Sequence, residues 1–149
     1  MKKQIFSEIV IAAPVATVWA ILARTADYSD WNPFIRRIDG SLDPGGRLSV
    51  VLALGADREI TIKPRLIRVL AQREIRWIGR MGIAGLFDGE HSFAVEPEGA
   101  GTTRFIHQET FSGLLVPFLW PSLKPRVEKA FADMNSRLKQ RAEAHTLPK

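Results

Sequence analysis

An apolar stripe at helical spacing near the C-terminus constrains the fold of this 149-residue chain more than any other feature. Its residues recur every three or four positions, which predicts a long helix over about 122–144 with one buried side. Prolines at positions 117, 121 and 125 predict a broken or kinked approach to that helix. The stripe consists of Leu123, Val127, Phe131, Met134 and Leu138.

Most of the chain before this helix has the alternation of β-strands. There are two exceptions. We expect a helix over 14–25, because Pro14 suits a first helical turn. We expect an irregular or short helical segment over 27–34, because Pro33 keeps Asn32 out of helical geometry. The later strands have one charged and one aromatic face, so we expect an α+β fold in which a curved antiparallel sheet of six to seven strands covers the long helix. The predicted strands span 3–12, 35–41, 47–54, 58–70, 73–80, 86–96 and 102–111.

Composition narrows the class of protein. The length fits one domain over 1–149, and the hydrophobic content of 46% is ordinary for a globular chain. There is no cysteine, which fits the cytoplasm and leaves no disulfide framework. The three histidines lack metal-ligand spacing, so we expect neither a metal site nor a cofactor.

The net charge of +5 is concentrated near the C-terminus, where residues 124–149 hold seven Lys/Arg and three acids. We interpret this as the solvated face of the helix; without a nucleic-acid motif we expect no nucleic-acid partner, and peripheral membrane contact is the weaker alternative. The start "MKKQIFSEIVIAAPVATVWAILA" is basic and then apolar, and so resembles a secretory signal. Glu8 and Pro14 interrupt its apolar segment, which favours a strand followed by a helix over a signal. The sequence leaves open whether the protein is a monomer or a homodimer.

The stretch "TRFIHQETF" over 103–111 places two ionisable groups on an aromatic strand face. Alternation puts Phe105, His107, Glu109 and Phe111 on the same side. The preceding predicted strand puts His91 and the aromatic Phe93 on the matching face. This arrangement predicts a polar group within the covered side of the sheet.

The loop between these two strands decides which residues face each other. A five-residue loop at 98–102 sets His91 opposite Glu109 and Phe93 opposite His107, whereas a tighter loop sets His91 opposite His107. Directly opposed Cβ atoms lie roughly 4.5–5.5 Å apart. We favour His91 facing Glu109, because a hydrogen bond between them relieves the cost of a buried carboxylate.

Seven short motifs, taken in order, resemble those of a known family. They are "AP…VW" (13–19), "DYSDWNPFIRRIDG" (27–40), "PGGRL" (44–48), "REIRW" (73–77), "GLFDGEHSF" (85–93), "TRFIHQETFSGLL" (103–115) and "FADMNSRLKQRAE" (131–143). Over nearly the whole chain they resemble the polyketide cyclase/dehydrase-like branch of the SRPBCC superfamily, the START-related helix-grip proteins. The resemblance implies a cavity between the concave sheet face and the long helix.

Such a cavity would be lined by the aromatic sheet face, by part of the helix stripe and by the apolar segment "GLLVPFLWP" over 113–121, which we interpret as a lid or entrance. Trp31 and Phe34 would flank its mouth, and Trp77 would form part of its wall. The candidate ligand contacts are Trp31, Phe34, Trp77, Phe87, His91, Phe93, Phe105, His107, Glu109, Leu115, Phe118, Leu119, Leu123, Val127, Phe131 and Met134.

Three interpretations of the His and Glu residues remain open. They form a polar cluster that fixes strand register, or they orient a ligand at the polar end of an apolar cavity, or they act as acid–base groups. The sequence therefore predicts a binding protein for a small hydrophobic or amphipathic molecule, such as a polyketide-like aromatic, a fatty acid or an isoprenoid. The alternative is a cyclase or dehydratase that uses His91, His107 and Glu109.

Overall fold

The computed structural model describes residues 2–55 and 58–146. A strand opens the chain and three helical segments follow it, namely β1 (Lys2–Ile11), α1 (Val15–Ala23), η1 (Thr25–Asp27) and α2 (Tyr28–Trp31). The strands after them are β2 (Ile35–Asp39), β3 (Ser49–Ala53), β4 (Glu59–Ile62), β5 (Arg65–Leu70), β6 (Glu74–Arg80), β7 (Asp88–Pro97) and β8 (Thr103–Ser112). The helix α3 (Val116–Thr146) ends the described chain.

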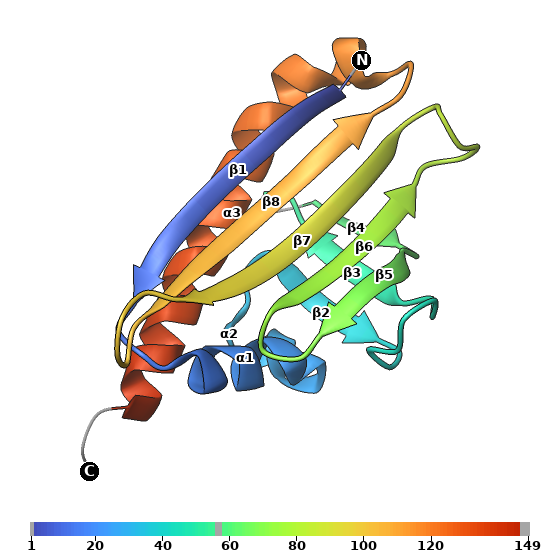
Figure 1. The fold of residues 1–149 in the computed structure, drawn as a ribbon. Helices are drawn as coiled ribbons and strands as arrows, with labels where there is room; N and C mark the ends of the chain where they lie inside the picture. Colours follow the sequence, from blue (N-terminus) through green and yellow to red (C-terminus); the bar gives the residue numbers. More distant parts are fainter. Residues whose placement is uncertain (1, 56–57, 147–149) are drawn as a thin grey trace.

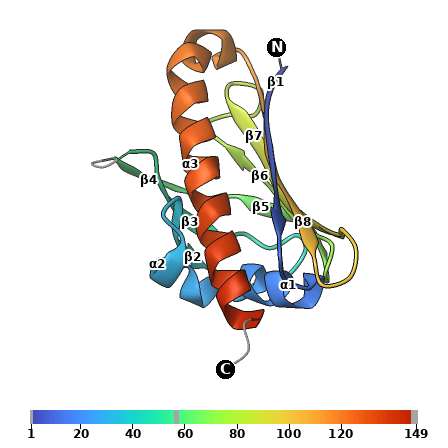
Figure 2. The ribbon, with the colours of Figure 1, turned by 90° about the vertical axis from the view of Figure 1, so that its left-hand side faces the viewer.

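The antiparallel strands wrap around α3, as Figures 1 and 2 show, which confirms the α+β helix-grip fold. A five-stranded sheet has the order β1-β8-β7-β6-β5, and a smaller sheet has the order β2-β3-β4. The described residues thus hold eight strands in two sheets, where we expected six to seven in one. The added strand arises because the predicted segment 58–70 is interrupted between Ile62 and Arg65, where Pro64 has no N–H for a ladder.

The helix α3 begins six residues earlier than predicted and runs without a break through its prolines. Its 31 residues give a length of about 46 Å. Pro121 and Pro125 each remove a hydrogen bond to the carbonyl four residues earlier, which belongs to Pro117 and Pro121 respectively. All three prolines are exposed, so water can hydrate those carbonyls and the predicted break is unnecessary.

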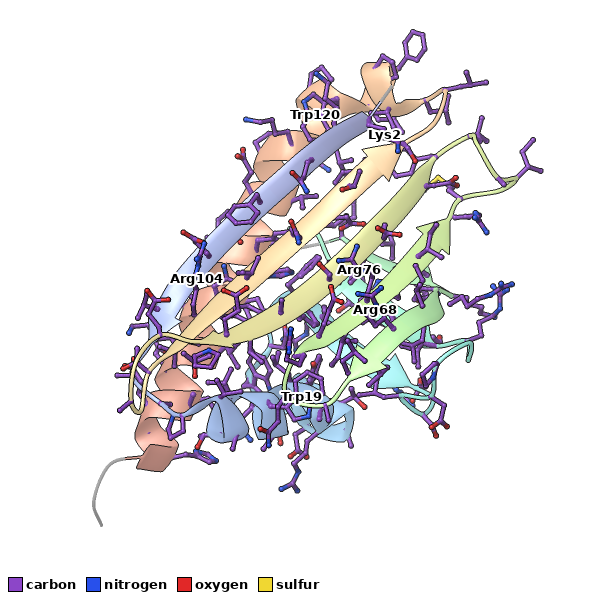
Figure 3. All side chains as sticks on the ribbon, in the orientation of Figure 1. Lys2, Trp19, Arg68, Arg76, Arg104 and Trp120 are labelled. Atoms are coloured by element: carbon purple, nitrogen blue, oxygen red, sulfur yellow. The ribbon has the colours of Figure 1, made fainter. Side chains whose placement is uncertain are left out.

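The two faces of the larger sheet are sorted as the alternation predicts. Trp77 and Phe93 are buried on the side of α3, whereas Arg76 lies on the opposite face and pairs with Glu74 at 2.6 Å and Glu90 at 3.0 Å. Figure 3 shows Arg68, Arg76 and Arg104 along the outer surface of the strands. The helix stripe from Val127 to Leu138 is buried against the inner face. No helix among residues 2–55 and 58–146 is both long and apolar enough to cross a bilayer.

Candidate functional site

A cleft of about 380 Å³ lies where the smaller sheet, the larger sheet and α3 meet. Its walls are mainly apolar, and its ionisable groups are Lys63, Arg80 and Glu109. The cleft is partly open to solvent, whereas we expected an internal cavity. It is lined by Phe34, Leu52, Leu54, Ile60, Thr61, Ile62, Lys63, Trp77, Gly79, Arg80, Met81, Gly82, Phe87, Gly89, Glu109, Phe111, Leu123 and Val127.

Local turn chemistry places Phe34 at this cleft. The side-chain Oδ1 of Asn32 accepts hydrogen bonds from the backbone N–H of Phe34 at 2.9 Å and of Ile35 at 2.8 Å. This Asx turn leads the chain from α2 into β2, which agrees with the turn-forming role of an Asn before Pro33. Phe34 then packs on Phe131 of α3, with ring centroids 5.6 Å apart.

Glu109 enters the cleft because a glycine stands beside it. Gly89 of β7 faces Phe111 of β8, one inward position away from the directly opposed pair His91 and Glu109. A Cβ atom at position 89 would overlap the Oε2 atom of Glu109 and lie 3.7 Å from Phe111. The carboxyl group thus occupies the space that a side chain at position 89 would fill, and it lies on the cleft wall.

The surroundings of Glu109 keep its carboxyl group protonated. Desolvation by the apolar walls raises its pKa from the ordinary value of 4.5 to about 8. At pH 7 the neutral form of Glu109 is therefore favoured. Its side chain forms no hydrogen bond or ion pair with the described residues, so its O–H is free to donate to a ligand.

The two histidines bond to each other behind the cleft. His91 Nε2 and His107 Nε2 are 2.8 Å apart, and both side chains are buried. His91 stacks on Trp77 with ring centroids 4.7 Å apart, and His107 stacks on Phe131 at 3.6 Å. Neither histidine lines the cleft. The pair belongs to the packed layer between the sheet and α3.

A chain of hydrogen bonds fixes the proton positions of this pair. Asn135 Nδ2 donates to Ser7 Oγ at 2.9 Å, so Asn135 Oδ1 accepts from His107 Nδ1 at 2.9 Å. His107 Nε2 is then the acceptor, and His91 Nε2 donates to it. His91 Nδ1 consequently carries a lone pair, which is buried without a hydrogen-bond partner among the residues that the structure describes. Ser7 completes the chain by donating to the carbonyl oxygen of His107 at 3.1 Å.

Burial keeps both imidazoles neutral. Desolvation lowers the pKa of His107 to about 3, although its hydrogen bond with Asn135 acts in the opposite direction. Desolvation, followed by repulsion from His107, lowers the pKa of His91 well below its ordinary value of 6.5. Two neutral rings can share one N–H···N bond, whereas two imidazolium ions at this distance would repel each other.

The strand register that we favoured is confirmed, but the hydrogen bond that we inferred from it is wrong. His91 faces Glu109 and Phe93 faces His107. The ring of His91 instead reaches its diagonal neighbour His107, because its stacking on Trp77 directs it there while Glu109 leans over Gly89. The polar residues therefore divide into a buried histidine pair and a carboxyl group on the cleft wall.

The predicted ligand contacts also divide by position. On the cleft wall lie Phe34, Trp77, Phe87, Glu109, Leu123 and Val127. Within the packed interior, away from that wall, lie His91, Phe93, Phe105, His107, Phe131 and Met134. Whether any of them touches a ligand stays a prediction.

The remaining candidates lie outside the cleft. Trp31 lines a separate hollow of about 420 Å³ beside α1 and the end of α3, and its ring packs edge-on against Tyr28 with centroids 5.3 Å apart. Leu115 is half-buried, whereas Phe118 and Leu119 are exposed. The predicted lid over 113–121 is mostly helical, since α3 starts at Val116 and directs these side chains to solvent.

The list of candidates from the sequence omits the wall that the smaller sheet contributes. Leu52 of β3 and Ile60 and Ile62 of β4 face β6 and β7 across the cleft. Their alternation predicts strands but does not reveal which sheet they join. Gly89 is the one usable signal, since a glycine within a strand often marks the close approach of another group.

Antiparallel strands that grip a long C-terminal helix and leave an apolar cleft beside it define the helix-grip class of protein. A sequence model of one family in this class, described as polyketide cyclase / dehydrase and lipid transport, matches residues 4–143. The chain therefore belongs to this family, within the SRPBCC/START-like superfamily.

Solved structures share the fold at low sequence identity. The Zhui aromatase/cyclase from Streptomyces sp. R1128 is 17% identical, with a TM-score of 0.80 over 99% of this chain and 97% of its own. A START superfamily protein from Mycobacterium smegmatis is 19% identical, with a TM-score of 0.75 over 96% and 99%. A norcoclaurine synthase from Thalictrum flavum is 16% identical, with a TM-score of 0.73 over 99% and 98%. No curated protein sequence matches the chain.

Proposed function

We propose that this protein binds a small hydrophobic or amphipathic molecule in the cleft and that neutral Glu109 donates a hydrogen bond to an oxygen atom of that molecule. The observation that carries the proposal is a protonated, otherwise unbonded carboxyl group on an apolar wall. The cleft volume of about 380 Å³ lies in the usual range for small-molecule sites. Membership of a family that includes lipid transport supports the same kind of ligand.

The charges at the cleft narrow the class of ligand. Lys63 and Arg80 are exposed and line the cleft, and the nearest acid to Arg80 is Asp88, with an Nε to Oδ2 distance of 3.8 Å. Because Glu109 is neutral at pH 7, the charged side chains on the cleft walls are cations. An apolar molecule with an acidic end fits this pattern, so a fatty acid is favoured over a neutral isoprenoid or polyketide-like aromatic.

A fluorescent fatty acid provides the first test. We expect cis-parinaric acid to bind the wild-type protein saturably, with its emission quenched by a long-chain fatty acid that displaces it. Glu109→Leu keeps the size of the side chain but removes the donor, and a lost hydrogen bond weakens binding by about three- to tenfold. Glu96→Gln, on the outer face of β7, is the matched control and should bind as the wild type does.

The pH dependence of binding tests the role of the proton. Ionisation of Glu109 near pH 8 replaces a donor with a negative charge, so the affinity of the wild type should fall as the pH rises from 7 to 9. Glu109→Gln keeps a donor that does not titrate, and its affinity should stay constant over this range. Absence of saturable binding by the wild type would refute the ligand site. Equal affinity of Glu109→Leu and the wild type would refute the hydrogen bond alone.

The pKa of Glu109 also favours a second function, a cyclase or dehydratase in which this residue transfers the proton. A general acid–base group is most effective when its pKa lies near the working pH. His91 and His107 are not part of this proposal, because they lie behind the wall and remain neutral. Turnover of a linear poly-β-ketone should then be lost in Glu109→Gln and kept in Glu96→Gln. Equal rates in both variants would contradict this catalytic role of Glu109.

The cytoplasmic location stays a prediction.

A further inference from the structure

Large apolar side chains gather in solvent at one end of the molecule. They come from the connection between β6 and β7, and from the connection between β8 and α3 together with the first turn of α3. Folded proteins seldom leave several such side chains together in water unless the surface has a partner. We call this group the apolar tip; its members, with their exposed fractions, are Phe118 (80%), Ile83 (76%), Leu114 (76%), Met81 (53%) and Leu119 (39%).

Backbone hydrogen bonds hold the two connections together. The N–H of Leu114 donates to the carbonyl of Gly85 and the N–H of Leu115 to that of Leu86, both at 3.0 Å. The two connections lie at the same end of the strands as the N-terminus (Figure 1). The two connections are therefore tied to each other, and the side chains of the tip are exposed to solvent.

Cations flank the apolar tip. Lys2 is the strand partner of Ser112, which ends β8 just before the connection to α3. Figure 3 labels Lys2 and Trp120 of α3 at the same end of the molecule. Neither Lys2 nor Lys3 forms an ion pair with the described residues. Lys124, one turn after Trp120, is 3.4 Å from Glu128 and half exposed. The tip thus combines protruding apolar groups with an excess of positive charge.

We infer that the apolar tip docks on an anionic membrane surface, with Phe118, Ile83 and Leu114 inserted at the boundary between headgroups and acyl chains. Apolar insertion combined with nearby lysines is the pattern that binds acidic lipid. A second copy of the chain fits less well, because its own lysines would face these cations. Met81 and Gly82 also line the cleft, so docking would turn the cleft towards the bilayer; this last step rests on the proposed function.

Co-sedimentation with lipid vesicles tests the docking. The full chain should sediment with vesicles of equal parts phosphatidylcholine and phosphatidylserine, and less with phosphatidylcholine alone. Phe118→Ser should weaken binding roughly tenfold, the effect of losing one large inserted apolar side chain. Phe6→Ser is the matched control, since Phe6 is 52% exposed on the outer face of β1. Lys2→Glu combined with Lys124→Glu should weaken binding most at low salt.

Three outcomes would overturn the inference. They are no sedimentation of the wild type, equal binding by Phe118→Ser and the wild type, or equal binding to both vesicle compositions. A dimer in light scattering that Phe118→Ser dissociates would assign the tip to a second copy instead. Failure here is separable from failure of the ligand proposal, because Phe118 does not line the cleft and its variant should bind cis-parinaric acid in solution as the wild type does.

Discussion

The burial of Glu109 makes a quantitative prediction about how stability depends on pH. Its pKa is about 8 in the folded protein and 4.5 as an ordinary value. Between these two values the folded state binds more protons than the unfolded state, so the free energy of unfolding falls as the pH rises. This loss of unfolding free energy grows from pH 4.5 upward and reaches its full size above pH 8.

The two histidines act in the opposite direction, but over a lower range. Their folded-state pKa values are depressed, so the unfolded state takes up protons first as the pH falls below 6.5, and stability is lost there. At pH 6.5 about half of the unfolded-state histidines still carry a proton, and only above about pH 7.5 are they neutral in both states. Between pH 6.5 and 8 the ionisation of Glu109 costs about 1.6 kcal/mol, and the histidines offset about 0.8 kcal/mol of this, at 1.36 kcal/mol for each pH unit.

Urea unfolding at half-unit steps from pH 5 to pH 9 measures this effect. We expect the wild type to be most stable near pH 6.5 and to lose about 1 kcal/mol by pH 8. Glu109→Gln should lack the loss above pH 6.5 while keeping the decline at acid pH. A wild type with constant stability from pH 6.5 to 8, or a variant that declines in parallel with it, would refute the assignment of a raised pKa to Glu109.

Two further substitutions test the parts of the site separately. Asn135→Ala leaves the buried N–H of His107 without its acceptor, so it should lower the free energy of unfolding, measured in urea, by about 2–3 kcal/mol. Ser136→Ala, at an exposed neighbouring position, is the control. An equal effect of the two substitutions would contradict the hydrogen-bond chain. Gly89→Ala should displace the carboxyl group of Glu109 and weaken cis-parinaric acid binding, whereas Glu96→Gln, on the outer face of the same strand, should not. Unchanged binding in Gly89→Ala would contradict the proposed position of the anchor.

The sequence predicts local pairing well because alternation and loop length are local quantities. The five-residue loop at 98–102 is sufficient to set His91 opposite Glu109, and the structure has this register. The stripe of α3 likewise predicts which helix face is buried, from Val127 through Leu138. Both predictions depend on residues that are neighbours in one strand pair or one helix.

Other features depend on contacts that no single strand pair encodes. The alternation in β4 cannot show that Ile60 and Ile62 would face a second sheet across a cleft, because the same pattern suits one continuous sheet. The prolines of α3 predict a break only if their carbonyl partners are buried, and these carbonyls face water. The partner of His91 depends on where the rings of Trp77 and Phe131 leave room, which is decided by packing of the whole core.

The same packing explains why one aromatic strand face carries two kinds of polar group. Alternate positions of β8 place His107 and Glu109 two residues apart, but their neighbours on β7 differ. His107 lies opposite Phe93 and under Phe131, where only a neutral ring with internal partners is stable. Glu109 lies beside Gly89, where the missing side chain opens a path to the cleft. A glycine on β7 therefore leaves one of the two polar groups on the cleft wall, whereas the other remains part of the core.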